Sequence, residues 1–248
     1  MKIGLAKEIK DGEYRVAITP SNVEKLVSKG HELYVESDAG KAAGFTNGDY
    51  INAGATIVAT EREVWEESQL VVKVKEILPE EFSYPSNNNI LFTYIHSANR
   101  KPQTMCLLNS GCVAFAYEDV YDSKTGEYPL LTPMSRIAGE VGFLTGLSNS
   151  FTTVGGSGQL VCGGPGIKPM KIVVLGAGNV GLAVARLACG LKAEVVMMDT
   201  NIDRLGHITD CLLPQASTEF SSHENICKEI KDADIVYNCV KYFPGLKL

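Results

Sequence analysis

Residues 171–181, KIVVLGAGNVG, join an apolar run to three glycines in the spacing G-x-G-x-x-G. The apolar residues 171–175 predict a buried strand, and the glycines predict a tight turn into a helix. Gly176 allows the turn, Gly178 leaves room for a pyrophosphate against the backbone, and Gly181 lets the helix pack closely on the strand. The segment therefore predicts a dinucleotide-binding site in a parallel α/β domain.

The residues after the glycines strengthen this prediction. A helix that starts at Asn179 and Val180 directs free backbone N–H groups and the positive end of its dipole toward the phosphates. A second strand is predicted over residues 194–198, and Asp199 ends it, 18 residues after Gly181. An acid at that distance accepts hydrogen bonds from the adenosine ribose and repels a 2′-phosphate. We therefore expect NAD rather than NADP.

The composition excludes several classes of protein. The chain has 248 residues, of which 45% are hydrophobic and 21% charged, and 23 Lys and Arg against 29 Asp and Glu give a net charge of −6. These values exclude a disordered tail, a coiled coil or a collagen and disfavour nucleic acid as a partner. No apolar run is long enough to span a membrane, and charges come too early for a signal peptide. We expect a cytoplasmic protein.

The seven cysteines give no sign of a disulfide framework or a zinc site. Their number is odd, and no pair has the C-x-x-C spacing. No cluster of His, Cys, Asp and Glu has metal-ligand spacing either. We expect reduced thiols and no metal.

Strands and helices alternate along the chain, which predicts doubly wound parallel sheets in an α/β fold. In the first block, Thr19 and Pro20 mark the N-cap and first residue of a helix that Gly30 ends. The strands expected in this block are 2–5, 31–35, 56–59, 70–75, 90–95 and 113–117, and the helices are 20–29, 61–67 and 101–109.

A second block follows a long predicted helix at about 133–149. Its expected strands are 171–175, 194–199, 216–218 and 235–240, and its helices are 179–191 and 225–231. We expect a substrate domain over residues 1–133 and a nucleotide domain over 134–248. The glycine-rich residues 155–166 read as a linker or hinge. Two such domains are typical of an enzyme with a cleft between them.

Three side chains of the first block are candidates for chemistry. Arg15 follows the first strand, Lys75 ends a strand, and His96 follows another. The carboxyl ends of parallel strands build binding sites. There a guanidinium can hold a carboxylate with two hydrogen bonds, and an imidazole can give and take protons near neutral pH. Taken singly, each could instead be a surface or structural residue.

Several segments resemble the bacterial alanine dehydrogenases and, more broadly, the family they share with the NAD-binding part of proton-translocating transhydrogenase. The resemblance covers essentially the whole chain and is carried by MKIGLAKE at residues 1–8, RVA at 15–17, KVKE at 73–76, FTYIH at 92–96, PLLTPMS at 129–135, the glycine motif and DTNIDRL at 199–205.

The resemblance implies a role for each matching residue. Arg15 and Lys75 match residues that bind the substrate carboxylate and carbonyl, and His96 matches the proposed acid/base. Ser135 and Asp199 match cofactor contacts, and Met134 and Arg204 match further ones. The implied reaction is the NAD-dependent, reversible oxidative deamination of L-alanine to pyruvate and ammonium. His96 favours this reaction over that of the transhydrogenase branch, which has no histidine there. A non-catalytic NAD-binding relative stays open, as do other small 2-amino acids.

The resemblance also implies a longer chain. A complete nucleotide domain of this kind has six strands, whereas only four are predicted here. The family places an aspartate near the nicotinamide, and helices that return to the first domain, in the part that would follow residue 248. We therefore expect an incomplete second domain with an exposed sheet edge at 235–240. Family members are commonly hexamers, so we expect a homo-oligomer.

Overall fold

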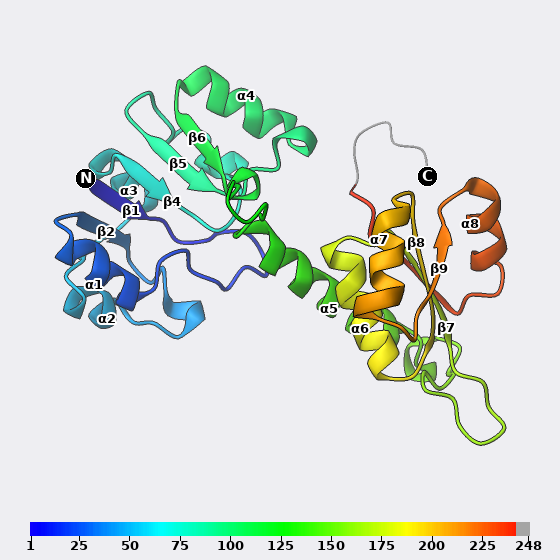
Figure 1. Ribbon diagram of the computed structural model, residues 1–248. Helices are drawn as coiled ribbons and strands as arrows, with labels where there is room; N and C mark the ends of the chain where they lie inside the picture. The colour runs from blue at the N-terminus through cyan, green and yellow to red at the C-terminus, as the bar shows by residue number, and fades with distance from the viewer. Residues whose placement is uncertain (242–248) are drawn as a thin grey trace. The chain divides into compact units, whose positions relative to one another are not determined.

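A computed structural model describes residues 1–241 of the chain. They form two compact units, one over Met1–Tyr128 and one from Pro129 onward. Figure 1 shows the helices and strands of both units and labels most of them.

The first unit is a six-stranded parallel sheet wound with helices. The sheet has the order β3-β2-β1-β4-β5-β6, so that successive strands are added on one side of β1 up to β3 and on its other side from β4 onward. Its strands are β1 (Lys2–Leu5), β2 (Glu32–Glu36), β3 (Thr56–Val58), β4 (Leu70–Val72), β5 (Ile90–Thr93) and β6 (Val113–Ala116). Its helices are α1 (Pro20–Ser28), α2 (Asn47–Asn52), α3 (Glu61–Glu67) and α4 (Lys101–Ser110), with the short 3-10 turns η3 (Ser97–Asn99) and η4 (Tyr117–Asp119) among the connections.

Apolar residues cover both faces of this sheet. On one face, Val23 of α1 and Tyr50 of α2 pack with side chains of β1 and β2. On the other, Val64 and Trp65 of α3 and Leu107 of α4 pack with Val71 and Leu91. Burial on both faces is why the central strands β1 and β4 are nearly continuous apolar runs rather than alternating ones.

The second unit holds a four-stranded parallel sheet of order β10-β7-β8-β9. Its strands are β7 (Lys171–Leu175), β8 (Glu194–Asp199), β9 (Ser217–Phe220) and β10 (Ile235–Asn238), and its helices are α5 (Leu131–Asn149), α6 (Asn179–Gly190), α7 (Ile202–His207) and α8 (His223–Ile230). Numbered from β7, the order is 3-2-1-4, which is the first part of the six-stranded nucleotide-binding order. As expected, the last of these strands, β10, lies at a sheet edge.

Helices also cover both faces of the second sheet. Phe143 of α5 and Val184 of α6 pack over Ile172 and Val174 of β7. Ile226 of α8 packs over the opposite face, with Val173. The helix α5 reaches the edge strand as well, because the Tyr237 hydroxyl donates to the Phe143 carbonyl at 2.9 Å.

The fold class and most predicted elements are confirmed, and the main differences concern strand ends, the glycine-rich segment and two short helices. Strand β4 ends at Val72 and strand β5 ends at Thr93, short of Lys75 and Ile95. Thr19 and Pro20 occupy the N-cap and the first position of α1, as expected, although the Thr19 side chain makes no capping hydrogen bond. The glycine-rich residues 155–166 are not a linker between the units, since they lie inside the second one. The helices α2 and α7 were not predicted.

Candidate functional site

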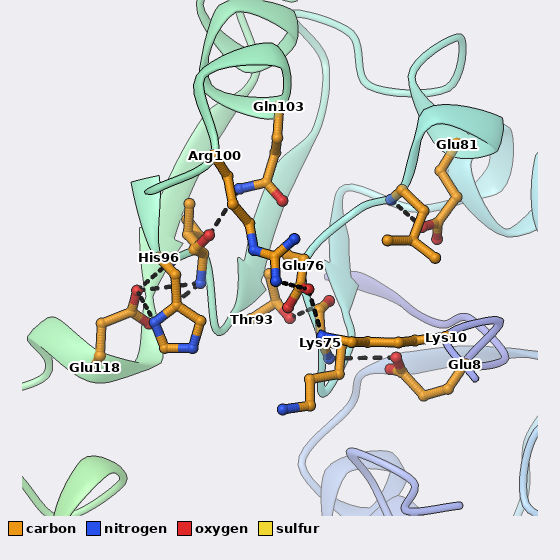
Figure 2. Close-up of polar contacts among 12 residues, drawn as sticks. Glu8, Lys10, Lys75, Glu76, Glu81, Thr93, His96, Arg100, Gln103 and Glu118 are labelled. Carbon is orange, nitrogen blue, oxygen red and sulfur yellow. Dashed lines mark hydrogen bonds and ion pairs between the residues drawn. The ribbon is translucent and has the colours of Figure 1, made fainter. Parts of the chain in front are cut away.

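Lys75 lies three residues beyond the end of β4, and its backbone is held from two sides. The Glu8 carboxylate accepts the N–H groups of Val74 at 2.6 Å and of Lys75 at 3.2 Å, and the Thr93 hydroxyl donates to the Lys75 carbonyl at 2.8 Å (Figure 2). The sequence suggests that Lys75 ends the strand. Instead, β4 ends at Val72, and the Glu8 carboxylate accepts the next backbone N–H groups in place of the carbonyl groups of a neighbouring strand.

Arg15 is held by a carboxylate of its own loop. Its Nε donates to Oε1 of Glu13 at 2.8 Å and a terminal nitrogen donates to Oε2 at 2.6 Å. The pKa of Glu13 lies below its usual value, mainly because Arg15 donates to it and to a smaller extent because Lys75 is nearby. Arg15 and Glu13 line a cavity of about 260 Å³ together with Lys7, Glu8 and Asp38. Neither Lys75 nor His96 lines this cavity.

His96 stands in a left-handed backbone conformation, with φ of 53° and ψ of 43°. Few residues other than glycine adopt it, and it persists only where the surroundings impose it. Here Glu118 imposes it. Its carboxylate accepts the backbone N–H of Ile95 at 3.2 Å and that of His96 at 2.5 Å, and it lies 3.5 Å from Nδ1 of the His96 ring. The ring is 43% exposed, so it stays accessible.

The three candidates lie on loops at the carboxyl edge of one sheet, after β1, β4 and β5. Tyr94 connects two of them. Its ring stacks on that of His96 with centroids 6.0 Å apart, and the charge of Arg15 opposes the rise that burial causes in the pKa of Tyr94. The structure thus brings Arg15, Lys75 and His96 to one edge, at three different loops.

Sequence reasoning missed the carboxylates that build this edge. Glu8, Glu76 and Glu118 look like ordinary surface acids in the sequence. In the fold, Glu76 is 1% exposed and carries two cations, Lys10 and Arg100. A signal was available for Glu8 and Glu76, because each directly follows a lysine of a segment that carries the resemblance.

A second group of buried charges lies beneath the edge. The Lys73 ammonium is 2.5 Å from the Glu81 carboxylate and 3.8 Å from that of Glu61. Burial and the neighbouring Glu81 raise the pKa of Glu61 to about 8, so that Glu61 is protonated at neutral pH. This arrangement balances one buried cation against one buried anion. Its role is in the fold of the first unit.

The glycine turn of the second unit has the geometry that the motif predicts. Gly176 has φ of 93°, and a Cβ there would crowd the backbone of Cys239. A Cβ at Gly181 would overlap the carbonyl oxygen of Gly176, so only glycine allows α6 to begin so close to β7. A Cβ at Gly178, in contrast, would meet nothing within 4 Å. The backbone at Gly178 is therefore open on the side where a ligand can approach.

Asp199 fastens the end of β8 to this turn. Its carboxylate accepts the N–H groups of Ala177 at 2.8 Å and Asn201 at 2.9 Å, and Arg204 lies 3.4 Å away. Burial by itself raises the pKa of Asp199, but these donors outweigh it and hold the pKa below its usual value. The carboxylate is thus ionised beside the glycine turn, where a sugar hydroxyl could donate to it.

The remaining predicted residues lie around the start of α6. Asn179 and Val180 form its first turn, and the Asn179 amide lies 3.5 Å from the Thr132 hydroxyl of α5. Met134 and Ser135 belong to the first turns of α5, next to Thr132. The structure brings these residues and the glycine turn together in the second unit.

Residues 1–241 hold no group of His, Cys, Asp and Glu arranged to bind a metal ion. Over the same residues, no helix is long and apolar enough to cross a bilayer. All seven cysteines are free.

Comparison with known proteins identifies the family. Two family models match consecutive parts of the chain, the alanine dehydrogenase/PNT N-terminal domain over residues 4–138 and the C-terminal domain over residues 144–247. The chain belongs to the alanine dehydrogenase/PNT family. The C-terminal domain of this family binds NAD(H).

The relatives are alanine dehydrogenases that are longer than this chain. That of Methanococcus maripaludis is 41% identical over 247 residues, and the chain spans 66% of its length. A solved L-alanine dehydrogenase is 40% identical with a TM-score of 0.83 over 95% of this chain, which covers 65% of that one. The transhydrogenase of Sinorhizobium meliloti shares the fold at 21% identity, with a TM-score of 0.74 over 99% of this chain and 71% of that one.

Proposed function

We propose that the chain catalyses the NAD-dependent, reversible oxidative deamination of L-alanine to pyruvate and ammonium. The observation that carries the proposal is the edge of the first sheet, where Arg15, Lys75 and His96 lie on three loops and each contacts a carboxylate of the same unit. Glu13 holds the Arg15 guanidinium, Glu8 accepts the Lys75 N–H, and Glu118 accepts the His96 N–H. It supplies a group for a substrate carboxylate, a group for a carbonyl oxygen, and an acid/base.

The second unit fits a bound dinucleotide. The open space at Gly178 leaves room for a pyrophosphate, and no side chain caps the N-terminus of α6 there. Asn179 and Val180 would offer backbone N–H groups to the phosphates. Asp199, with Arg204 beside it, would accept hydrogen bonds from the hydroxyl groups of the adenosine ribose. Met134 and Ser135 would contact the cofactor from α5. The negative charge of Asp199 favours NAD over NADP.

The proposed chemistry divides among three side chains. Arg15 holds the substrate carboxylate. When bound, NAD supplies the acceptor for the hydride that leaves Cα. Lys75 donates a hydrogen bond to the oxygen that becomes the pyruvate carbonyl and favours negative charge on it. Loss of the hydride leaves an iminium at Cα, which water attacks. His96 takes a proton from this water and returns one to the departing amine, alternating between base and acid.

The test is oxidation of L-alanine by the purified chain. With NAD present, the proposal predicts one pyruvate and one ammonium for each NADH formed. NADH binding without turnover would instead identify a non-catalytic NAD-binding relative. Hydride transfer from NADPH without any reaction of alanine would identify transhydrogenase chemistry. Glycine and 2-aminobutyrate, tested beside L-alanine, define the substrate's side chain.

A further inference from the structure

We propose that Glu76 is the positioning residue of this site: one buried carboxylate anchors both the loop that carries Arg15 and the turn that carries His96. The inference rests on the proposed function, because it concerns the geometry of the same three side chains. It assigns a role to a residue next to Lys75 that would not itself touch substrate.

The carboxylate of Glu76 is a shared anchor for two cations. Its Oε1 lies 2.6 Å from Nζ of Lys10 and 2.6 Å from a terminal nitrogen of Arg100 (Figure 2). The Glu76 side chain is 1% exposed, whereas both cations reach it from partly exposed positions. Burial by itself raises the pKa of Glu76, but the two cations outweigh it and the group stays ionised. A buried carboxylate is stable as an anion only when cations pair with it, so Glu76 holds both Lys10 and Arg100, and with them their two loops, at its carboxylate.

From Lys10, the connection to Arg15 runs through a single turn. The Lys10 carbonyl accepts the N–H of Glu13 at 3.1 Å, and the Glu13 carboxylate in turn holds the Arg15 guanidinium at 2.6 and 2.8 Å. A shift of Lys10 therefore moves the group on which the orientation of Arg15 depends.

From Arg100, the connection to His96 is equally short. The turn η3 lies between them, with the Asn99 N–H donating to the His96 carbonyl at 3.1 Å and the Arg100 N–H donating to the Ser97 carbonyl at 3.2 Å. In addition, the amide of Gln103 donates to the Ile95 carbonyl at 2.8 Å. A shift of Arg100 therefore moves the backbone of His96.

The backbone that carries Glu76 is itself held in place. The peptide groups before it are held by Glu8 and Thr93. Figure 2 shows the side chains of Lys75 and Glu76 leaving the backbone in different directions. One short segment thus presents Lys75 on one side and anchors the neighbouring loops on the other.

The test compares four variants in NADH oxidation with pyruvate and ammonium. Glu76→Gln keeps the size of the side chain and removes its charge, and Glu80→Gln, at an exposed position nearby, is the matched control. Since misplacement by about 1 Å costs roughly 100-fold, we expect kcat/KM for pyruvate to fall by about that factor in Glu76→Gln and not in the control. Lys10→Met should mainly raise KM for pyruvate, through Arg15. Arg100→Met should mainly lower kcat, through His96.

Two results would overturn the proposal. One is kinetics of Glu76→Gln that match those of Glu80→Gln. The other is an equal loss in Lys10→Met and Arg100→Met with no split between KM and kcat, accompanied by an equal loss of thermal stability, which is what a merely structural ion pair gives. If Glu76→Gln does not fold, the split between KM in Lys10→Met and kcat in Arg100→Met still tests the proposal.

Failure of the proposed function is a separate outcome. If the wild-type chain turns over no substrate, amide hydrogen exchange decides the anchoring role. The proposal then predicts faster exchange over residues 10–15 and 96–100 in Glu76→Gln than in Glu80→Gln, with residues 171–199 unchanged. Equal exchange in the two variants would refute the anchoring role, whatever the enzyme activity.

Discussion

The carboxylate of Glu118 both accepts the backbone N–H of His96 and lies 3.5 Å from Nδ1 of its ring. Glu118 comes from η4, after the edge strand β6, and reaches across to the end of β5. One side chain thus fixes the left-handed backbone of His96 and faces Nδ1, which leaves Nε2 for the proposed acid/base role.

Glu118→Gln should therefore reduce turnover without abolishing it. Glutamine keeps one oxygen for a backbone N–H but loses the charge that strengthens these hydrogen bonds. We expect kcat for NADH oxidation to fall about 10-fold, which corresponds to about 1.4 kcal/mol. Asp119→Asn, at the exposed neighbouring position, is the control. Equal kcat values for the two variants would contradict the role given to Glu118.

Two glycine variants separate folding from cofactor binding. Gly181→Ala places a Cβ against the Gly176 carbonyl and should lower the free energy of unfolding by about 2–3 kcal/mol. Gly178→Ala meets no protein atom within 4 Å and should change stability by less than about 1 kcal/mol while NADH binding is lost. Urea unfolding and NADH fluorescence titration measure the two quantities. Undiminished NADH affinity in Gly178→Ala would exclude the pyrophosphate from this position.

Asp199→Ala tests the ribose contact. Loss of the carboxylate removes the proposed acceptor for the hydroxyl groups and the charge that repels a 2′-phosphate. NADH affinity should fall at least about 10-fold, or about 1.4 kcal/mol, and the preference over NADPH should shrink. Asp203→Ala, exposed on α7, serves as the control. If the variant discriminates between the two dinucleotides as wild type does, another residue sets the preference.

The buried Glu61 predicts a particular dependence of stability on pH. Its pKa is about 8 in the folded chain and near 4.5 when unfolded, so the folded state binds the extra proton between these values. The stabilising contribution is complete below pH 4.5 and declines as the pH rises toward 8, by a few kcal/mol in total. Glu61→Gln mimics the protonated form and should flatten this decline.

Trp65 gives a direct measurement of this effect. It is the single tryptophan of the chain, and its Nε1 donates to Oε1 of Glu61 at 3.2 Å. Urea unfolding followed by its fluorescence, at several pH values, yields the two stability curves. Parallel curves for wild type and Glu61→Gln would show that Glu61 does not take up a proton on folding.

The features that could be predicted from the sequence are those specified by residues close together in the chain or by general properties of parallel sheets. The strand β7, the glycine turn, α6 and Asp199 lie within 29 residues, and each is specified by its own segment. The placement of Arg15, Lys75 and His96 at one edge followed from a general property of parallel sheets. The helix α2 was missed although its signal is local, since Thr46 and Asp49 form a capping box.

The carboxylates of the first unit could not be predicted in this way. Glu8 binds the backbone 66 residues away, and Glu118 binds His96 from 22 residues away. Residue type and local pattern do not show which backbone N–H groups these carboxylates accept, because that depends on which strands become neighbours. For the same reason the strands β4 and β5 end early, where side chains replace the ladder.

The most direct test of the central claim is the consumption of NADH by this chain with pyruvate and ammonium, measured for wild type, His96→Ala and the exposed control His207→Ala. We expect turnover by wild type and the control, and a loss of about 10²- to 10⁴-fold in His96→Ala, the usual contribution of general acid/base catalysis. Turnover that survives in His96→Ala would contradict the assignment of His96, and a wild-type chain that binds NADH without consuming it would contradict the proposed activity.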